Sequence, residues 1–303
     1  MATVQKLEYH VVDVFTEQPF AGNPLAVVLG SGQLGAEQMQ LIAAEFQLSE
    51  TAFPLGPTDS LEAARAGADY QLRIFTPDTE LPFAGHPSIG TAWLLQQLKW
   101  FGPGEVRQLC GEGLLPLSVD AEGATLTGGT PRVGEPIDPL AALAALGLAP
   151  EDLRGEAVRV ASTGLSFAIV PVAADALGKC EPDIARLRRD FSYPAAATGI
   201  YVCAWGDSPL SISARMFAGD IGSPEDAATG SGALALGAYL GNSGLLPEGT
   251  STVEVTQGVE MGRPSTLRVS CDVANGLVQG VRVTGKVVPV ATGQIAVPAA
   301  NAS

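Results

Sequence analysis

The sequence contains few histidines and cysteines. Its 303 residues include 2 histidines and 4 cysteines, and no two cysteines form a Cys-x-x-Cys pair. In a chain of this length, this pattern argues against a disulfide framework and against a zinc site, and so few histidines argue against a histidine-based metal centre. We therefore predict no metal, and reduced, mostly buried thiols at Cys110, Cys180, Cys203 and Cys271.

Cofactor-binding motifs are also scarce. Gly280–Lys286 has the spacing of a phosphate-binding loop, but Val287 replaces the required Ser or Thr and the surrounding residues favour strands. Gly30–Gly35 fits a dinucleotide-binding pattern, without the repeated strand–helix alternation that such a fold needs. No lysine lies in a glycine- and serine-rich run, which argues against a pyridoxal enzyme. We expect no cofactor.

Long apolar runs and excess positive charge are absent as well. The longest apolar stretches, such as Pro139–Leu148, are far shorter than the ~20 residues of a membrane-spanning helix. The formal net charge of −15 repels nucleic acid and anionic lipid. Residues 1–9 mix acidic and basic side chains without an apolar segment, so we predict no signal peptide. We expect a cytoplasmic protein that binds neither nucleic acid nor membrane.

Glycine and proline, in contrast, are abundant and spread through the chain, with 36 Gly and 22 Pro. Short runs rich in Val, Ile, Phe and Tyr have the length of strands, and four helical patterns interrupt them. These patterns begin near Gly35, Pro87, Asp138 and Ser231. Many strands with few helices predict an α+β protein.

The most informative feature is an internal duplication. Gly22–Val28 resembles Gly164–Val170, and Arg73-Ile-Phe-Thr, 51 residues after Gly22, resembles Arg215-Met-Phe-Ala, 51 residues after Gly164. Each arginine motif is followed by an acidic residue, Glu80 or Glu225, and a glycine-containing turn into a helix. The order and spacing of these motifs predict two homologous α+β domains.

We place the domain boundaries from this duplication. The N-terminal domain is predicted to span residues 1–127 and the C-terminal domain residues 128–286, with Gly128–Gly134 as the linker. Such a chain is long enough to bury two modest cores.

Each predicted domain delivers a glycine onto a helix N-terminus, at Gly85 and at Gly230. The unpaired N–H groups at a helix start attract anions, and glycine lets the backbone approach a ligand closely. An ordinary glycine turn is the better interpretation of either junction alone, but the paired occurrence favours a site. If the domains pack around a pseudo-twofold axis, both turns would face one cleft that suits a small carboxylate.

Glu50 is the candidate acid/base. It precedes the apolar run Thr51–Phe53, which would tend to bury it, and a buried carboxyl group can donate and accept protons near neutral pH. The pattern alone favours a solvated glutamate at a helix end, so this interpretation needs further support. Asp226 and His86 are the other polar residues at the repeat positions, and a histidine beside proline is usually structural.

The sequence resembles the PhzF-like (phenazine biosynthesis) isomerase and epimerase family. The matching blocks follow the family's order over most of the chain and comprise Asp13–Val27, Leu48–Phe53, Arg73–Pro87, Arg215–Phe217 with Glu225–Ser231, and Gly262–Ser265. The resemblance implies the diaminopimelate epimerase-like fold, with two pseudo-symmetric α+β barrel-like domains, each around a central helix. It also implies a homodimer without a cofactor, and a C-terminal strand, about residues 287–303, that returns to the first domain.

The resemblance also implies roles for individual residues. Glu50 matches the family's general acid/base, and His86, Asp226 and Ser231 match groups that bind substrate or relay protons. The remaining matches are substrate-binding residues, with Gly85 and Gly230 as backbone donors to the substrate carboxylate, together with Asn23. A better-known member moves a proton within trans-2,3-dihydro-3-hydroxyanthranilate.

Three departures from the family's patterns affect the prediction. Ala227 replaces a usual proline, which changes the stiffness of a loop rather than the chemistry. Ala84 and Thr229 occupy the positions at which the epimerase relatives carry cysteines, which excludes a two-thiol racemase. We therefore predict a biosynthetic isomerase that acts on a small carboxylate. The alternatives are an epimerase or racemase of an amino-acid-like substrate, and a non-catalytic protein that binds small carboxylates.

Overall fold

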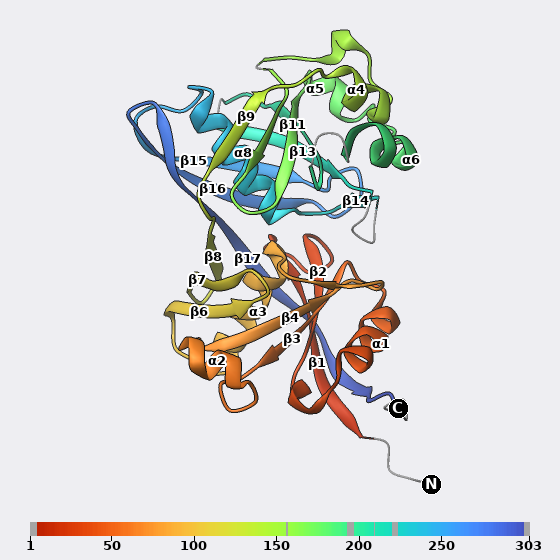
Figure 1. Cartoon of the computed structure of the whole chain (residues 1–303), viewed down its shortest axis with the longest axis vertical. Helices are drawn as coiled ribbons and strands as arrows, with labels where there is room; N and C mark the ends of the chain where they lie inside the picture. Colours follow the sequence, from red (N-terminus) through yellow and green to blue (C-terminus); the bar gives the residue numbers. More distant parts are fainter. Residues whose placement is uncertain (1–4, 156, 193–196, 209, 220–223, 300–303) are drawn as a thin grey trace. The chain divides into compact units, whose positions relative to one another are not determined.

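The computed structural model describes residues 5–155, 157–192, 197–208, 210–219 and 224–299 (Figure 1). The chain divides into two compact units, which are described separately. Unit 1 comprises Met1–Leu126 and Gly285–Ser303, and unit 2 comprises Thr127–Thr284. Among the described residues, no helix is long and apolar enough to cross a membrane.

Unit 1 is built from short strands with few helices. Its strands are β1 (Lys6–Val14), β2 (Asn23–Val28), β3 (Glu50–Leu55), β4 (Tyr70–Phe75), β5 (Glu80–Leu81), β6 (Gly104–Cys110), β7 (Gly113–Val119), β8 (Gly123–Thr127) and the second half of β17 (Leu277–Ala296). Its helices are the 3-10 turn η1 (Ser31–Gln33), α1 (Ala36–Phe46), α2 (Leu61–Ala66) and α3 (Gly85–Gln97).

The strands of unit 1 close into a barrel. Neighbouring strands pair in the order β17–β1–β2–β3–β4–β6–β7–β8, and β8 pairs with β17 again. The pairs β2–β3 and β4–β6 are parallel. Helix α3 is the central helix, because every residue from Gly85 to Gln96 is buried. Gly90 allows this packing, since a Cβ there would lie 2.7 Å from Val14 Cγ2 and 2.8 Å from Leu25 Cδ2.

Unit 2 repeats this plan. Its strands are β9 (Arg132–Pro136), β10 (Arg159–Ser162), β11 (Ser166–Pro171), β12 (Gly199–Trp205), β13 (Ser211–Phe217), β14 (Glu225–Asp226), β15 (Gly249–Gln257), β16 (Ser265–Ala274) and the first half of β17. Its helical segments are α4 (Leu140–Leu146), η2 (Pro150–Asp152), α5 (Ala174–Leu177), α6 (Ile184–Arg186), η3 (Leu187–Ser192) and α8 (Gly230–Asn242).

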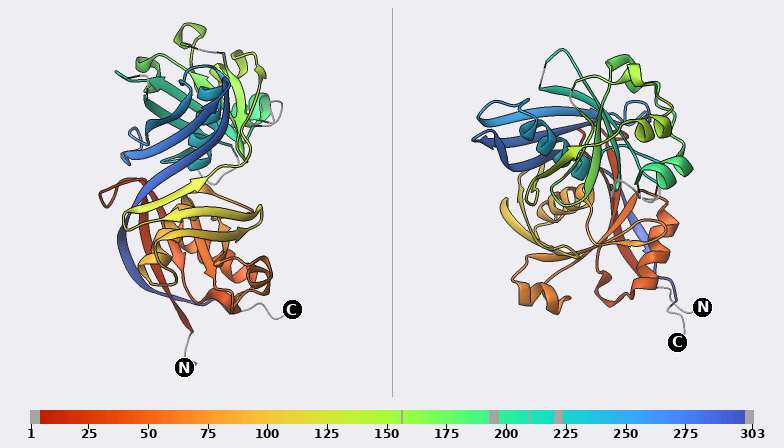
Figure 2. Two further views of the ribbon diagram at one scale, coloured as in Figure 1. Left: turned by 90° about the vertical axis from the view of Figure 1, so that its left-hand side faces the viewer. Right: turned by 45° about the horizontal axis from the view of Figure 1, so that its top comes forward.

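Helix α8 is the central helix of unit 2, where the strands surround it (Figure 2). Its residues Gly230–Gly241 are all buried. The strands pair in the order β9–β10–β11–β12–β13–β15–β16–β17, with β11–β12 and β13–β15 parallel. The parallel pairs therefore fall at the same steps of the order as β2–β3 and β4–β6 in unit 1.

The duplicated arginine motifs form the same contact in both units. Arg73 binds Glu80 through two hydrogen bonds of 2.7 Å each, and Arg215 binds Glu225 through two of 2.8 and 2.9 Å. Each guanidinium also lies over the ring of the phenylalanine two residues later, at 5.2 Å for Phe75 and 4.8 Å for Phe217. The predicted fold class, with two α+β barrel-like halves around central helices, is confirmed.

The expected helix starts needed small corrections. The pattern near Asp138 begins as helix α4 only at Leu140, because the Asp138 carboxylate first accepts a hydrogen bond of 3.0 Å from the Leu140 N–H. The helix placed after Pro87 and the one placed after Ser231 begin earlier, at Gly85 and Gly230.

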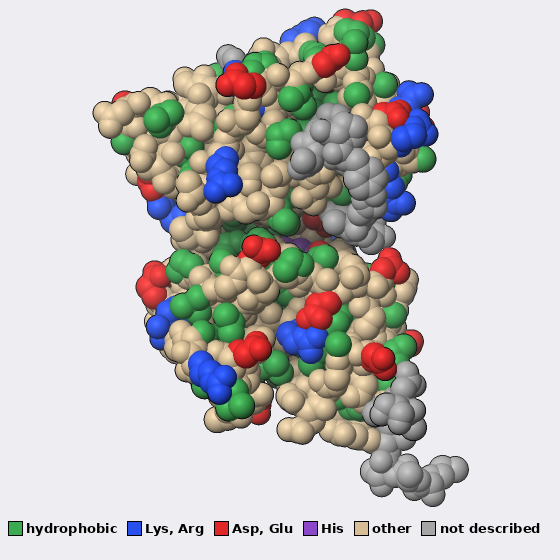
Figure 3. Space-filling model, viewed as in Figure 1, with side chains coloured by type: hydrophobic (Ala, Val, Ile, Leu, Met, Phe, Trp, Pro, Cys, Tyr) green, Lys and Arg blue, Asp and Glu red, His purple; other side chains and the backbone are tan. Residues whose placement is uncertain are grey.

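Charged side chains of both signs lie on the face of the molecule that Figure 3 shows. There, acidic and basic side chains are scattered among hydrophobic and other side chains rather than gathered in one patch. The four thiols lie inside, since all the cysteines are free and buried. Burial raises the pKa of Cys203 and of Cys271 to about 12, which keeps both thiols protonated.

Candidate active site

Glu50 lies at the start of a fully buried strand. Helix α1 ends at Phe46, and Gln47 takes a left-handed conformation with φ of 53° that turns the chain towards β3. All six residues of β3 are buried, and Glu50 pairs with Leu25 in the parallel β2–β3 ladder. The Glu50 residue is only 9% exposed. The expectation that its apolar neighbours bury it is correct, and the alternative of a solvated glutamate is wrong.

Glu50 contacts a histidine that comes from the central helix. His86 lies in the first turn of α3 and is 4% exposed. Its Nε2 atom lies 3.4 Å from Glu50 Oε2, and its Nδ1 atom lies 3.2 Å from the Asn23 amide Nδ2. The Ser49 hydroxyl donates to Asn23 Oδ1 at 3.4 Å. The strand start, the central helix and the strand β2 thus bring Glu50, His86 and Asn23 together in unit 1.

The imidazole of His86 is uncharged at neutral pH. Burial lowers the pKa of His86 to about 3, and a hydrogen bond with the Pro24 backbone opposes this effect only in part. The His86–Glu50 contact is therefore a carboxyl group against a neutral ring rather than an ion pair. The two ring nitrogens face different groups, since Nδ1 lies beside the Asn23 amide and Nε2 beside Glu50 Oε2.

Unit 2 contains a second group of predicted site residues. Asp226 ends the short strand β14, and its Oδ2 accepts a hydrogen bond of 2.8 Å from the Thr229 hydroxyl. Gly230 and Ser231 are the first two residues of α8 and are buried. The structure therefore brings Asp226, Gly230 and Ser231 into one short segment of unit 2.

Both central helices begin without a capping side chain. The N-cap residues are Ala84 for α3 and Thr229 for α8, and neither side chain accepts a hydrogen bond from its helix. Each helix has 13 residues, so each start carries the partial positive charge of a helix dipole. The predicted backbone donors Gly85 and Gly230 are the first residues of these helices.

The sequence interpretation missed two residues that shape the second group. Gln257, at the end of β15, is fully buried and hydrogen-bonds to both Asp226 and Thr229. Ser265 is 2% exposed, and its hydroxyl lies 3.1 Å from the Ala227 carbonyl oxygen. Ser265 lay in a block that matched the family, but Gln257 carried no sequence signal beyond its position shortly before that block.

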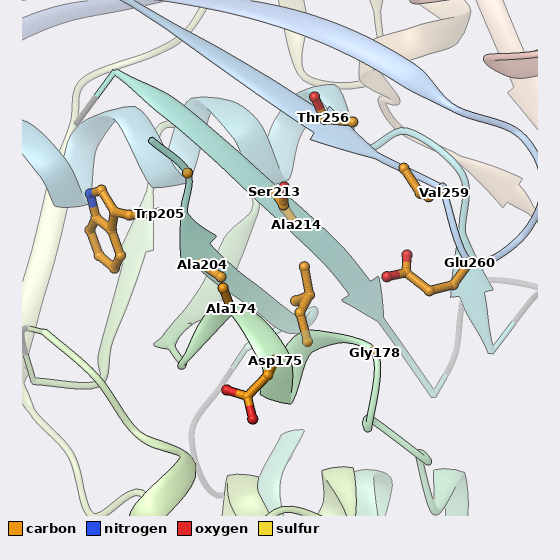
Figure 4. A pocket seen from close by; sticks show the side chains of 12 residues that line it. Ala174, Asp175, Gly178, Ala204, Trp205, Ser213, Ala214, Thr256, Val259 and Glu260 are labelled. Carbon is orange, nitrogen blue, oxygen red and sulfur yellow. The ribbon is translucent and has the colours of Figure 1, made fainter. Parts of the chain in front are cut away.

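The described residues hold no metal-ligand cluster, and a depression in unit 2 is lined by residues other than those predicted for the site. Within the described residues, no group of three or more His, Cys, Asp or Glu side chains could hold a metal ion. A depression of about 450 Å³ in unit 2 is lined by parts of α5, β12, β13 and β15, including Trp205, Ser213 and Glu260 (Figure 4). It contains none of the predicted site residues.

Comparison with known proteins identifies the family. A model of the PhzC-PhzF family, described as phenazine biosynthesis-like protein, matches residues 12–293. The chain belongs to this family. It is 35% identical to an uncharacterised isomerase of Mesorhizobium japonicum, over 96% of this chain and 99% of the relative. It is 33% identical to the trans-2,3-dihydro-3-hydroxyanthranilate isomerase of Pseudomonas aeruginosa, over 91% of this chain and 95% of the relative.

A solved structure agrees with this family assignment. The structure of a predicted epimerase from Pseudomonas aeruginosa is 32% identical and superposes with a TM-score of 0.79, over 95% of this chain and 99% of that protein. The resemblance inferred from the motifs is therefore confirmed, and the chain is an enzyme of the isomerase class.

Proposed function

We propose that this PhzC-PhzF family isomerase moves a proton within a small carboxylated substrate by general acid/base catalysis through Glu50, without a cofactor. The observation that supports this proposal is the burial of the Glu50 carboxyl group against the neutral imidazole of His86, at 3.4 Å. A buried, positioned carboxyl group is suited to accept a proton at one carbon and return it at another.

A neutral His86 fits both halves of such a transfer. A neutral imidazole carries one N–H donor and one acceptor nitrogen. It can therefore donate to the carboxylate form of Glu50 and accept from the protonated form by changing its tautomer. His86 thereby follows the protonation of Glu50 without adding a charge to the buried site, which would cost free energy. In this proposal His86 relays or orients the proton, and Asn23 holds its ring.

The substrate carboxylate is proposed to bind the starts of the central helices. Their first N–H groups are not capped by side chains, and helix N-termini attract anions. Gly85 and Gly230 would donate from the backbone, with Ser231 and Asp226 contacting the other polar groups of the substrate. The expectation that both helix starts bind the same carboxylate is part of this proposal, as are the homodimer and the cytoplasmic location.

The first test replaces the acid/base group. Trans-2,3-dihydro-3-hydroxyanthranilate is the first compound to assay, because a 33% identical relative is named for it. Glu50→Gln is nearly isosteric and should lower kcat by about 10²- to 10⁴-fold while leaving the fold intact. Glu45→Gln makes the same change at an exposed position of α1 and serves as the control. Near-normal turnover by Glu50→Gln would contradict the central claim.

A second candidate function is epimerisation, with Glu50 and Asp226 as two bases. The observation that favours it is the 32% identity to a structure described as a predicted epimerase. The reaction in deuterated water separates the two functions. An isomerase shifts a double bond, and its new C–H carries deuterium to the extent that the proton on Glu50 exchanges with solvent, whereas an epimerase leaves the bonding pattern unchanged and incorporates deuterium at a stereocentre with inversion there.

A further inference from the structure

The amide of Gln257 uses its full hydrogen-bonding capacity at the start of α8. Its Oε1 accepts from the Tyr201 hydroxyl at 2.9 Å and from the Thr229 N–H at 3.2 Å. Its Nε2 donates to the Asp226 carbonyl oxygen at 2.8 Å and to the Thr229 hydroxyl oxygen at 3.0 Å. Gln257 and Tyr201 are both 0% exposed. These bonds therefore form inside the protein, where an amide left unbonded would be costly.

The partners fix which way this amide faces. A backbone N–H can only donate, so the Gln257 atom that meets the Thr229 N–H must be the oxygen. A backbone carbonyl can only accept, so the atom that meets the Asp226 carbonyl must be the nitrogen. Both constraints give the same orientation of the Gln257 side chain.

That orientation also sets the direction of the Thr229 hydroxyl. The hydroxyl carries a single proton, and its oxygen already accepts from Gln257 Nε2. The proton is therefore directed to Asp226 Oδ2, at 2.8 Å. The result is a one-way series of donors, which runs from Tyr201 through Gln257 and Thr229 to the Asp226 carboxylate. We call it the Gln257 series.

Tyr201 is suited to begin this series. Burial raises the pKa of Tyr201 well above its ordinary value, and the Asp226 carboxylate adds a smaller effect in the same direction. The phenol therefore keeps its proton and remains a donor to Gln257. Successive hydrogen bonds in a buried series polarise one another, which strengthens the final bond to the carboxylate.

Unit 1 contains a matching series with a different end. The Tyr70 hydroxyl donates to Gln108 Oε1 at 2.8 Å, and Gln108 Nε2 donates to the Ser88 hydroxyl oxygen at 2.9 Å. Ser88 then donates to the Ala84 carbonyl oxygen at 2.8 Å. This series ends on the backbone at the start of α3, whereas the Gln257 series ends on a carboxylate. Fixing the helix start alone does not require a carboxylate as the last acceptor.

We propose that Gln257 and Thr229 are positioning residues that hold the Asp226 carboxylate in one orientation for the substrate. The inference rests on the proposed function, in which Asp226 contacts the substrate. Gln257 anchors the Asp226 backbone through its carbonyl, and Thr229 anchors the side chain through Oδ2. Together they hold Asp226 at its backbone and at one oxygen of its carboxylate.

The decisive variants change Thr229 alone. Thr229→Val keeps the shape and suits the extended backbone at this position, with φ of −110° and ψ of 91°, but removes the hydroxyl. Thr229→Ser keeps the hydroxyl. With trans-2,3-dihydro-3-hydroxyanthranilate as the probe, we expect Thr229→Val to lower kcat/KM about tenfold or more and Thr229→Ser to restore most of the loss. A purely structural role of the side chain would not produce this difference between two well-folded variants.

A second pair of variants controls for stability. Gln257→Leu and Gln108→Leu each remove a buried amide that bonds to a tyrosine and to a hydroxyl. Both should lower the stability of the protein, because each leaves buried polar groups without partners. We expect Gln257→Leu to lower kcat/KM about tenfold more than Gln108→Leu does, since only the Gln257 series ends on a carboxylate.

A crystal structure of Thr229→Val separates this inference from the proposed function. If the Asp226 carboxylate rotates or takes several conformers in that variant, the positioning role holds whatever the substrate is. If the carboxylate stays in place and Thr229→Val retains wild-type kcat/KM, the inference is overturned. If instead Asp226→Asn retains full activity, the proposed role of Asp226 at the substrate fails, and the crystal structure still decides the positioning role.

Discussion

At the scale of the residue, the candidate site combines groups that are rarely buried. Glu50 and His86 lie side by side with little exposure, and the free energy of burying them must be offset by the rest of unit 1. His86 avoids a buried charge by remaining neutral. Because the ring takes up a proton more readily in the unfolded chain, the stability of the protein depends on pH.

The depressed pKa of His86 predicts destabilisation in mild acid. Its pKa is about 3 in the folded state and about 6.5 in an unfolded chain, so between these values the unfolded state binds one more proton. The free energy of unfolding is therefore unaffected by His86 above pH 6.5. It falls as the pH falls from 6.5 towards 3, by up to about 1.4 kcal/mol per pH unit. Denaturant unfolding at a series of pH values measures this slope.

Removing the imidazole should flatten this dependence. We expect the free energy of unfolding of His86→Gln to fall less steeply with acid than that of the wild type, even if the variant is less stable at neutral pH. Equal slopes for His86→Gln and the wild type would show that this histidine is not held neutral.

At the scale of the element, the central helices determine which residues meet. Helix α3 brings His86 to Glu50 and Asn23 only because it runs inside the barrel, against β1 and β2. This packing depends on small residues in the helix. At Gly90 the helix backbone lies so close to the side chains of Val14 and Leu25 that a Cβ atom would not fit.

Gly90→Ala tests this close approach. Alanine is a better helix former than glycine by roughly 1 kcal/mol, but its Cβ would lie within 2.8 Å of the Val14 and Leu25 side chains. Overpacking of a tight core typically costs about 1–3 kcal/mol, so we expect a net loss of stability. Gly102→Ala, where a Cβ meets nothing within 4 Å, is the control. If the Tm of Gly90→Ala equals or exceeds that of the wild type, the side chains of Val14 and Leu25 can move to make room for the added methyl group.

Sequence patterns predicted the duplicated elements of the structure, but they did not predict which side chains contact one another inside it. The spacing of the Arg73 and Arg215 motifs predicted the duplication, because a repeated motif imposes the same local contact with an acidic residue. The contact between Glu50 and His86 followed from no spacing, since it depends on how a helix enters a barrel. The role of Gln257 was not visible either, because its partners come from β12, β14 and the start of α8. The predicted domain boundaries remain a prediction.

At the scale of the whole molecule, the C-terminal strand links the end of the chain to its beginning. The second half of β17 pairs with β1 from Val287 to Ala296, and β8 pairs with β17 on the other side. The barrel of unit 1 is therefore closed by residues that follow unit 2 in the sequence. Ile295 and Val297 also pack against the core cluster that contains Met39, Ile42 and Phe53.

Deleting residues 285–303 should therefore unfold unit 1 selectively. Without this segment, β1 keeps only its pairing with β2 and becomes an edge strand, and the core cluster of unit 1 loses apolar contacts. Deleting only residues 300–303 leaves the whole β1–β17 pairing in the sequence, because that pairing ends at Ala296, and it serves as the control. Hydrogen exchange followed by mass spectrometry distinguishes the units. We expect the longer deletion to remove protection in β1, β2 and β3 while α8 and β16 remain protected, whereas loss of protection in both units alike, or in neither, would contradict this account of how the barrel closes.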